Sequence, residues 1–148
     1  MLRLIPAALQ DAQILTAISK AAFDDDTARF MDADVPGPPG YDSVETTEYM
    51  ISNCHTYNVV LDATTVGGAV MYAEDGKQII GRIFLSPDSQ GKGLGRELMR
   101  LLEEKYRDSG TLYLDTPKAN RRTNRFYESC GYSVYRQDAF LNYYSKTL

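Results

Sequence analysis

The feature that most constrains this chain is a short glycine-rich segment, residues 90–95, which reads QGKGLG. An apolar run over residues 79–85 precedes it, and leucines follow at helical spacing, at positions 94, 98, 101 and 102. The predicted order is therefore strand, glycine turn, helix. Such a turn leaves the first backbone N–H groups of the helix without partners, at the positive end of the helix dipole. Because glycine lets a ligand approach the backbone closely, the segment predicts a site for a phosphate or pyrophosphate group.

Two common phosphate-binding patterns can be compared with this segment. A P-loop requires serine or threonine after its lysine, but Lys92 is followed by Gly93. The dinucleotide fingerprint is G-x-G-x-x-G, whereas this segment reads G-x-G-x-G. Asp115 nevertheless lies 20 residues after Gly95, near the place of a ribose-binding acid. Binding of an adenine dinucleotide therefore stays open as an alternative.

A pattern that fits without adjustment is Gln/Arg-x-x-Gly-x-Gly/Ala, met here by Gln90, Gly93 and Gly95. It resembles the acetyl-CoA loop of the GNAT superfamily of N-acetyltransferases. Residues 120–132, NRRTNRFYESCGY, resemble the family's second motif, Asn-x-x-Ala-x-x-Phe-Tyr-x-x-x-Gly-Phe, with Thr123 for the alanine and Tyr132 for the last phenylalanine. The two motifs stand in the family's order and separation, and with the preceding strand they span over a third of the chain.

The resemblance implies an α/β (α+β) fold with a mixed, mostly antiparallel central sheet flanked by helices. It also implies that the strands before and after the glycine-loop helix splay apart at their ends, so that the pantetheine arm lies between them. The expected enzyme is a transferase, an N-acetyltransferase that uses acetyl-CoA as the acyl donor. The acceptor would be a primary amine of a small molecule or peptide, attacking directly in a ternary complex. A non-catalytic acyl-CoA-binding sensor module is the other alternative.

The resemblance also assigns residues to the cosubstrate. Those expected to contact it are Ile83, Phe84, Leu85, Gln90, Gly91, Lys92, Gly93, Leu94, Gly95, Arg96, Asn120 and Tyr127. Tyr127 matches the tyrosine that protonates the departing thiolate in many family members, although it could simply pack beside Phe126. Asn120 matches a coenzyme-contacting asparagine, and its position before a helix also suits an N-cap.

The general base is not identified by the motifs. The attacking amine must be neutral, yet a free lysine-type amine has a pKa of about 10.4. A base, a water chain or a desolvated pocket must therefore remove its proton. Many relatives place a glutamate on the strand before the glycine loop, but residues 78–85 contain no carboxylate. The candidates are Glu74, Asp115, the loop residues Asp32 and Asp34, or water. An N–H group of Phe84 or Leu85 would stabilise the developing oxyanion.

A proline- and glycine-rich stretch separates the first two predicted helices. It runs from about residue 23 to residue 41 and predicts a long loop. Long loops in compact domains are often functional, and the resemblance implies that this one shapes the acceptor pocket. Asp32, Asp34 and Tyr41 are the residues assigned to acceptor binding. The same acids, with the run of aspartates at 24–26, predict a cationic acceptor attracted by their charge.

The remaining periodicities predict the other elements. Helices are expected over residues 7–23, 44–54, 94–107 and 123–130, and Asp42 or Ser43 can cap the second. Strands are expected over residues 2–5, 57–61, 66–73, 78–85, 111–115, 133–135 and 139–144. Asp75-Gly76 predicts the turn of an antiparallel meander, and the strand at 111–115 should run parallel to the strand at 78–85.

Composition limits the remaining classes. The 148 residues, 43% of them hydrophobic and without repeats or a linker, predict one domain over residues 1–148. The net charge of −4 argues against nucleic acid as a partner. Cys54 and Cys130 have no metal-site spacing, so no metal is expected and a reduced, cytoplasmic setting is the default. No signal or membrane-spanning pattern occurs, so no membrane partner is expected. Both a monomer and a homodimer remain possible.

Overall fold

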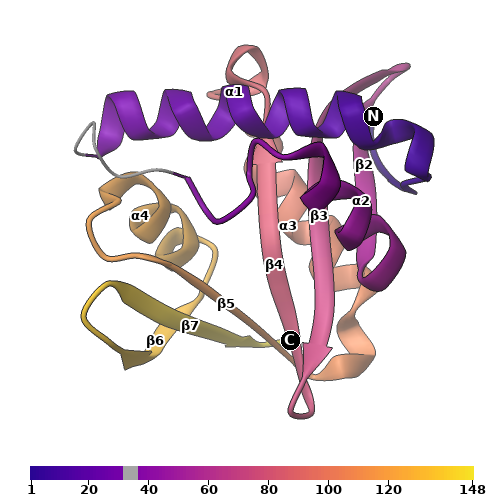
Figure 1. Ribbon diagram of the computed structural model, residues 1–148. Helices are drawn as coiled ribbons and strands as arrows, with labels where there is room; N and C mark the ends of the chain where they lie inside the picture. Colours follow the sequence, from indigo (N-terminus) through magenta and orange to yellow (C-terminus); the bar gives the residue numbers. More distant parts are fainter. Residues whose placement is uncertain (32–36) are drawn as a thin grey trace.

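A computed structural model describes residues 1–31 and 37–148 of the chain (Figure 1). The helices are α1 (Ala12–Phe30), α2 (Val44–Asn53), α3 (Leu94–Lys105) and α4 (Arg121–Ser129), with short 3₁₀ turns η1 (Leu9–Asp11), η2 (Pro87–Ser89) and η3 (Arg107–Ser109). The strands are β1 (Leu2–Pro6), β2 (His55–Leu61), β3 (Thr64–Glu74), β4 (Lys77–Leu85), β5 (Thr111–Pro117), β6 (Ser133–Gln137) and β7 (Leu141–Thr147).

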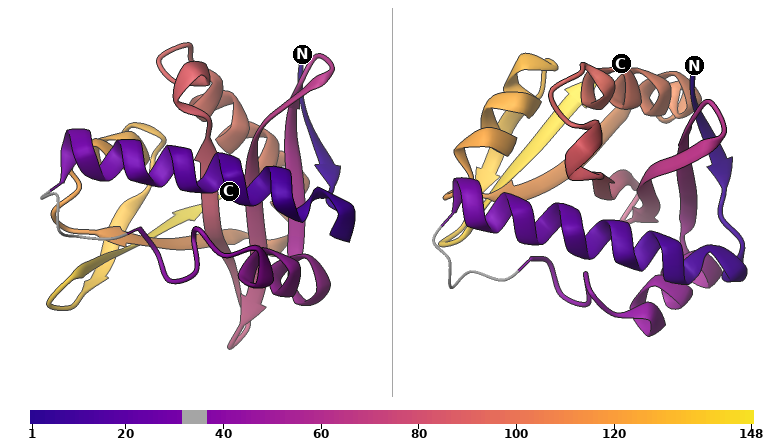
Figure 2. Two further views of the ribbon diagram at one scale, coloured as in Figure 1. Left: turned by 45° about the horizontal axis from the view of Figure 1, so that its top comes forward. Right: turned by 90° about the horizontal axis from the view of Figure 1, so that it is seen from above.

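The strands form one seven-stranded sheet in the order β1-β2-β3-β4-β5-β7-β6. All neighbouring strands are antiparallel except β4 and β5, which are parallel. Helices α1 and α2 lie on one face of the sheet, and α3 and α4 lie on the other (Figure 2). The predicted mixed, mostly antiparallel sheet with flanking helices is therefore confirmed.

Strands β4 and β5 are neighbours only where they begin. Within the described chain, their paired residues are Gln78 with Leu112 and Ile79 with Tyr113. Beyond these pairs the strands diverge, and the gap widens toward the glycine loop that follows β4. The predicted splay is confirmed. The second half of β4 consequently has no sheet partner on its β5 side, which leaves backbone polar groups there available to a ligand.

A hydrophobic core on the α3 side holds the glycine-loop helix in place. Leu98, Met99 and Leu102 of α3 are almost fully buried against Met71 and Leu112 of the sheet. Burial of each such side chain stabilises the fold by about 1.5–3 kcal/mol. A smaller cluster on the other face, formed by Leu15, Ala22 and Phe84, holds α1 against β4. The two clusters anchor elements on both sides of the gap.

Helix α1 is longer than its apolar periodicity predicts. The sequence places a loop from residue 23 onward, but the helix continues to residue 30. Ion pairs at i,i+4 spacing, Lys20 with Asp24 and Arg29 with Asp25, support the helix through the acidic stretch. Asp26 is buried. The assignment of these three aspartates to a loop is therefore wrong.

The other helix boundaries agree more closely with the prediction. Ser43 caps α2, because its side chain accepts a hydrogen bond from the backbone N–H of Thr46. Helix α4 begins two residues earlier than predicted and is followed by Gly131, which has a φ of +94°. Among the described residues, no helix combines the length and the apolar character needed to cross a membrane.

Candidate active site

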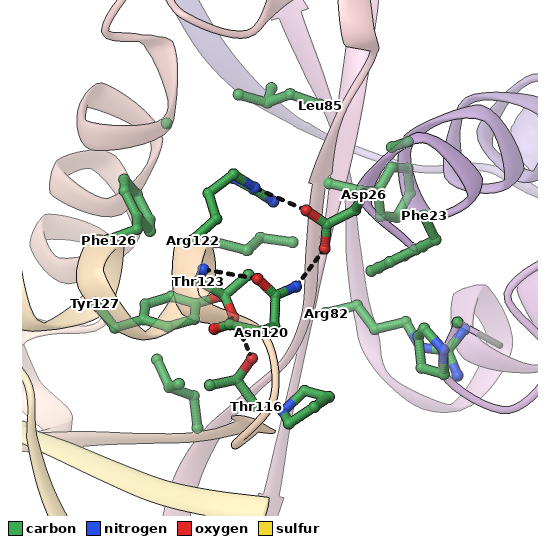
Figure 3. Close-up of a pocket in the computed structure, with 18 of the residues that line it drawn as sticks. Phe23, Asp26, Arg82, Leu85, Thr116, Asn120, Arg122, Thr123, Phe126 and Tyr127 are labelled. Atoms are coloured by element: carbon green, nitrogen blue, oxygen red, sulfur yellow. Dashed lines mark hydrogen bonds and ion pairs between the residues drawn. The ribbon is translucent and has the colours of Figure 1, made fainter. Parts of the chain in front are cut away.

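The gap between β4 and β5 opens into a cavity of about 640 Å³. This volume lies in the usual range for small-molecule sites, roughly 300–1,000 Å³. The cavity is lined by β4, β5 and the glycine loop, by α1 from one face of the sheet, and by α4 from the other (Figure 3). A ligand in the gap would therefore contact groups from both faces.

The glycine loop presents a set of free backbone donors at this cavity. Gly91 and Gly93 have φ values of +75° and +79°, in the left-handed region that favours glycine. The first helical hydrogen bond of α3 runs from the N–H of Glu97 to the carbonyl of Gly93, at 3.2 Å. Within the described chain, the six backbone N–H groups of residues 91–96 have no acceptor. Donors gathered at a helix N-terminus are an arrangement that favours anions, so the geometry of the loop agrees with the predicted phosphate site.

Two side chains fix this loop to its surroundings. The Gln90 Nε2 atom donates to the carbonyl of Leu85 at 3.0 Å, which ties the loop to the end of β4. The Arg96 guanidinium donates to the carbonyl and the hydroxyl of Ser129, at 3.1 and 2.9 Å, which ties α3 to α4. The hydrogen bonds of Arg96 thus connect the glycine loop to the second motif, residues 120–132, beside the cavity.

Most of the residues assigned to the cosubstrate line the cavity. They are Ile83, Phe84, Leu85, Gln90, Gly91, Gly93, Gly95, Arg96, Asn120 and Tyr127. Two assigned residues are not among the lining residues of the described chain. Lys92 is exposed, and Leu94 packs against the core. Their backbone N–H groups nevertheless belong to the free donors of the loop.

Asn120 has both ends of its side-chain amide engaged. Its Oδ1 accepts from the N–H of Thr123 at 3.1 Å, so Asn120 is the N-cap of α4. Its Nδ2 donates to Asp26 at 2.5 Å. The side chain is only 2% exposed. The capping interpretation is confirmed, and the same residue fixes the start of α4 beside the cavity.

Asp26 connects α1 to α4 across the cavity, a connection that the sequence reading missed. Its carboxylate forms an ion pair with the Arg122 guanidinium at 2.7 Å and also accepts from Asn120 (Figure 3). The buried positions 12, 15, 19 and 22 of α1 continue to 26 with helical spacing. Extending this spacing through the acidic stretch would have placed Asp26 on the inner face.

Among the described residues, none forms a hydrogen bond with the hydroxyl of Tyr127. Its ring is buried and packs edge-on against Phe126 and Tyr132, at centroid distances of 5.3 and 6.2 Å. Tyr127 is one of the residues that line the cavity. Burial raises the pKa of Tyr127 well above its usual value. The phenol therefore keeps its proton at neutral pH.

The structure separates Glu74 and Asp115, two of the acids that the sequence offers as bases. Asp115 lines the cavity from β5. Its neighbour Thr116 bonds Thr123 of α4 at 2.7 Å, so strand alternation points Asp115 to the opposite face, where α1 lies. Although Asp115 remains in contact with solvent, partial burial and the nearby negative charge of Asp138 raise its pKa. Glu74 is exposed at the β3–β4 turn, at the other end of β4 from the glycine loop, and does not line the cavity.

Of the three residues assigned to acceptor binding, the structure describes only Tyr41, which does not line the cavity. The Tyr41 hydroxyl donates to Asp24 at 2.6 Å, and its ring meets Phe23 edge-on at 6.0 Å. Phe23 lines the cavity, so Tyr41 stands behind it, outside the lining. Asp32 and Asp34 lie outside the described residues. Arg82, which the sequence reading did not single out, does line the cavity from β4.

Comparison with known proteins gives one family and one fold. Residues 20–132 match the model of the Acetyltransferase (GNAT) family. No curated protein sequence matches the chain significantly. Among solved structures, the PaiA N-acetyltransferase from Thermoplasma acidophilum in complex with coenzyme A is 16% identical, with a TM-score of 0.83 over 100% of this chain and 99% of that chain.

Two further structures are similar to this chain. The ribosomal-protein-S18-alanine N-acetyltransferase from Escherichia coli is 18% identical, with a TM-score of 0.74 over 99% of this chain and 94% of that chain. A GNAT family acetyltransferase from Elizabethkingia anophelis with acetyl-CoA bound is 16% identical, with a TM-score of 0.64 over 78% of this chain and 94% of that chain. At these identities the likeness concerns the fold.

Proposed function

Because the chain belongs to the GNAT family of acetyltransferases, we propose that it transfers an acetyl group from acetyl-CoA to a primary amine of a small molecule or peptide. The amine attacks directly, with both substrates bound. One observation carries the proposal: Gly91, Gly93, Gly95 and Arg96, whose backbone N–H groups have no acceptor among the described residues, line the same cavity as Tyr127, whose hydroxyl has no described partner. An anion site and a proton donor are thereby combined between two diverging strands.

The residues of the cavity fit the coenzyme. The free donors of the glycine loop suit its pyrophosphate, and Arg96 adds positive charge beside them. The edge of β4 that faces β5 has no strand partner beyond Ile79 among the described residues, and it offers backbone groups of Ile83 and Leu85 to an extended amide chain. Acetyl-CoA supplies the acetyl group in activated form, as a thioester. The coenzyme A and acetyl-CoA bound in two of the similar structures support this assignment.

Asp115 and Tyr127 divide the proton transfers between the two faces of the sheet. From the α1 face, the Asp115 carboxylate accepts a proton from the incoming ammonium, directly or through water. As the nitrogen–carbon bond forms and the carbon–sulfur bond breaks, Tyr127 on the α4 face gives its proton to the departing sulfur, and the nitrogen releases its second proton, which returns to Tyr127 through water. An N–H group of Phe84 or Leu85 donates to the oxygen on which negative charge develops.

The alternative functions differ in what they require of the cavity. Dinucleotide-binding proteins use a doubly wound, mostly parallel sheet, whereas β4 and β5 are the one parallel pair among the described strands. A sensor module requires the coenzyme site but no proton donor, and the hydroxyl of Tyr127, which has no partner among the described residues, favours an enzyme.

A panel of amines incubated with the protein and acetyl-CoA, with thiol release as the readout, tests the proposal. Amine-dependent thiol release, with the acetylated product identified by mass spectrometry, is the expected result. Thermal stabilisation by acetyl-CoA without thiol release for any amine would favour the sensor instead. Stabilisation by NADH and not by acetyl-CoA would exclude both the acetyltransferase and the sensor module.

A further inference from the structure

Arg82 is a cation of the cavity that lacks an anionic partner in the described chain. It lies half-buried on β4, and its one hydrogen bond there is donated by Nη2 to the carbonyl of Pro39. No carboxylate of the described residues lies within ion-pair distance of it. Burial lowers the pKa of the Arg82 guanidinium, which nevertheless stays charged. A partly desolvated charge is costly unless it is paired, so this position favours binding of an anion.

A β-bulge directs Arg82 into the cavity. Val70 of β3 pairs with Arg82, and the next residue, Met71, pairs with Ile80, so Gly81 is an extra residue in β4. Ile80 packs into the core on the α3 face. Without the bulge, alternation would point Arg82 toward that same core. With it, Arg82 shares the α1 face with Phe84, and Figure 3 shows it on the opposite side of β4 from Tyr127.

Arg82 and Asp115 lie at the same level of the two diverging strands. Ile79 and Tyr113 are the last paired residues of β4 and β5. Asp115 is two residues beyond Tyr113, and Arg82 is three beyond Ile79, one of the three being the bulge. Both side chains point to the α1 face, and they form no ion pair with each other. Paired parallel strands are about 4.8 Å apart and these strands diverge further, and both residues line the cavity, so one ligand in the cavity can contact both charges.

The other charged groups that line the cavity are already committed. Asp26 and Arg122 form an ion pair at 2.7 Å. Arg96 is bonded to Ser129 beside the glycine loop, where its charge is assigned to the pyrophosphate of the coenzyme. Among the described lining residues, Arg82 is therefore the cation available to an acceptor on the α1 face, opposite the carboxylate of Asp115.

We propose that the acceptor amine also carries a carboxylate, as an amino acid does, with the carboxylate bound by Arg82 and the amine beside Asp115. The proposal rests on the acetyltransferase function described above. A planar guanidinium binds a carboxylate through two parallel N–H donors, which orients the amine as well as holding it. The expectation of a cationic acceptor rested on five aspartates, three of which are now engaged in ion pairs within the protein.

Matched acceptor pairs test the proposal directly. Each amino acid is compared with its amide, which keeps the amine and removes the carboxylate charge, and thiol release from acetyl-CoA is measured. Amino acids should have a kcat/KM at least about tenfold higher, because a charge-assisted hydrogen-bond pair is lost in the amide. Diamines are included to test the cationic alternative.

Substitutions of Arg82 identify the group responsible. Arg82→Gln should raise KM for the amino acid about 10–100-fold with little change in kcat, and should leave kcat/KM for the amide unchanged. Arg82→Lys keeps the charge and should recover part of the loss. Arg100→Gln is the matched control, since Arg100 is exposed on α3 and pairs with Glu104 outside the cavity. Unchanged thermal stabilisation by coenzyme A shows that each variant is folded.

The other possible outcomes contradict either the carboxylate proposal alone or both proposals. Amides or diamines that are acetylated as well as amino acids overturn the carboxylate proposal and leave the acetyltransferase function intact. The same holds if a joint Asp32→Asn, Asp34→Asn variant raises KM for a diamine while Arg82→Gln has no effect. No thiol release with any amine, together with no amino-acid binding by calorimetry in the presence of coenzyme A, overturns both proposals.

Discussion

Replacing Tyr127 with phenylalanine removes the proposed proton donor and almost nothing else. The ring retains its contacts with Phe126, Tyr132 and Tyr144, whose centroids lie 5.3, 6.2 and 6.1 Å away. The hydroxyl has no hydrogen-bond partner within the described chain, so no group is left unpaired. The free energy of unfolding should therefore change by less than about 0.5 kcal/mol.

The expected loss is in the chemical step. Burial keeps the Tyr127 phenol protonated at neutral pH, so the proton is available when the sulfur departs. General acid catalysis contributes roughly 10²–10⁴-fold. We expect the lower end, a fall in kcat on the order of a hundredfold or about 2.7 kcal/mol, since water in the cavity can supply part of the function. The KM for acetyl-CoA should change little, because the interaction strengthens only in the transition state.

Tyr144→Phe is the matched control for this experiment. The Tyr144 hydroxyl donates to Asn124 at 2.6 Å and to Glu128 at 3.1 Å, and its side chain is fully buried. Its removal should cost about 1–3 kcal/mol of stability and leave kcat near that of the parent. Tyr127→Phe should therefore slow single-turnover thiol release and leave denaturant unfolding nearly unchanged. Tyr144→Phe should do the reverse. If Tyr127→Phe turns over within a few-fold of the parent while chemistry limits the rate, Tyr127 is a packing residue.

Three other perturbations follow from the same geometry. Valine at Gly93 should abolish stabilisation by acetyl-CoA in a thermal-shift assay, worth about 2.7 kcal/mol at a hundred times Kd; valine at Gly76, where φ is +76° in the β3–β4 turn, strains the backbone equally and should not. The pKa of Asp115 is raised by burial, and its protonated form cannot act as the base. The kcat/KM should therefore rise with pH as Asp115 ionises. If the same rise of kcat/KM with pH persists in Asp115→Asn, Asp115 is not the base. Asp26→Ala leaves the Asn120 amide unpaired and should lower stability by about 1–3 kcal/mol in denaturant unfolding; a loss below about 0.5 kcal/mol would mean that this contact contributes little.

Several parts of the site could be predicted from the sequence because they depend on neighbours along the chain. Glycines at 91 and 93 supply positive φ values, and the leucine spacing after them defines the buried face of α3. The N-cap at Asn120 is set by its own side chain and the N–H group three residues later. The family's two motifs carry the same local information, which is why the residues assigned to the cosubstrate, apart from Lys92 and Leu94, line the cavity.

The acceptor side was decided by contacts between distant parts of the chain. Asp26 reaches Arg122 across 96 positions, and no local pattern indicates that pairing. Glu74 and Asp115 are equally plausible bases in the sequence, but the antiparallel path of β3 and β4 carries Glu74 away from the cavity, while β5 brings Asp115 into it.

The direction of Arg82 depends on a single extra residue in the pairing of β4 with β3. Local sequence determines how the backbone turns and which face of a helix is apolar, since those properties act over a few residues. Strand register and the approach of charged groups across the gap follow from the packing of the whole sheet. Only the tertiary structure therefore decides which charged side chains face the part of the cavity proposed for the acceptor.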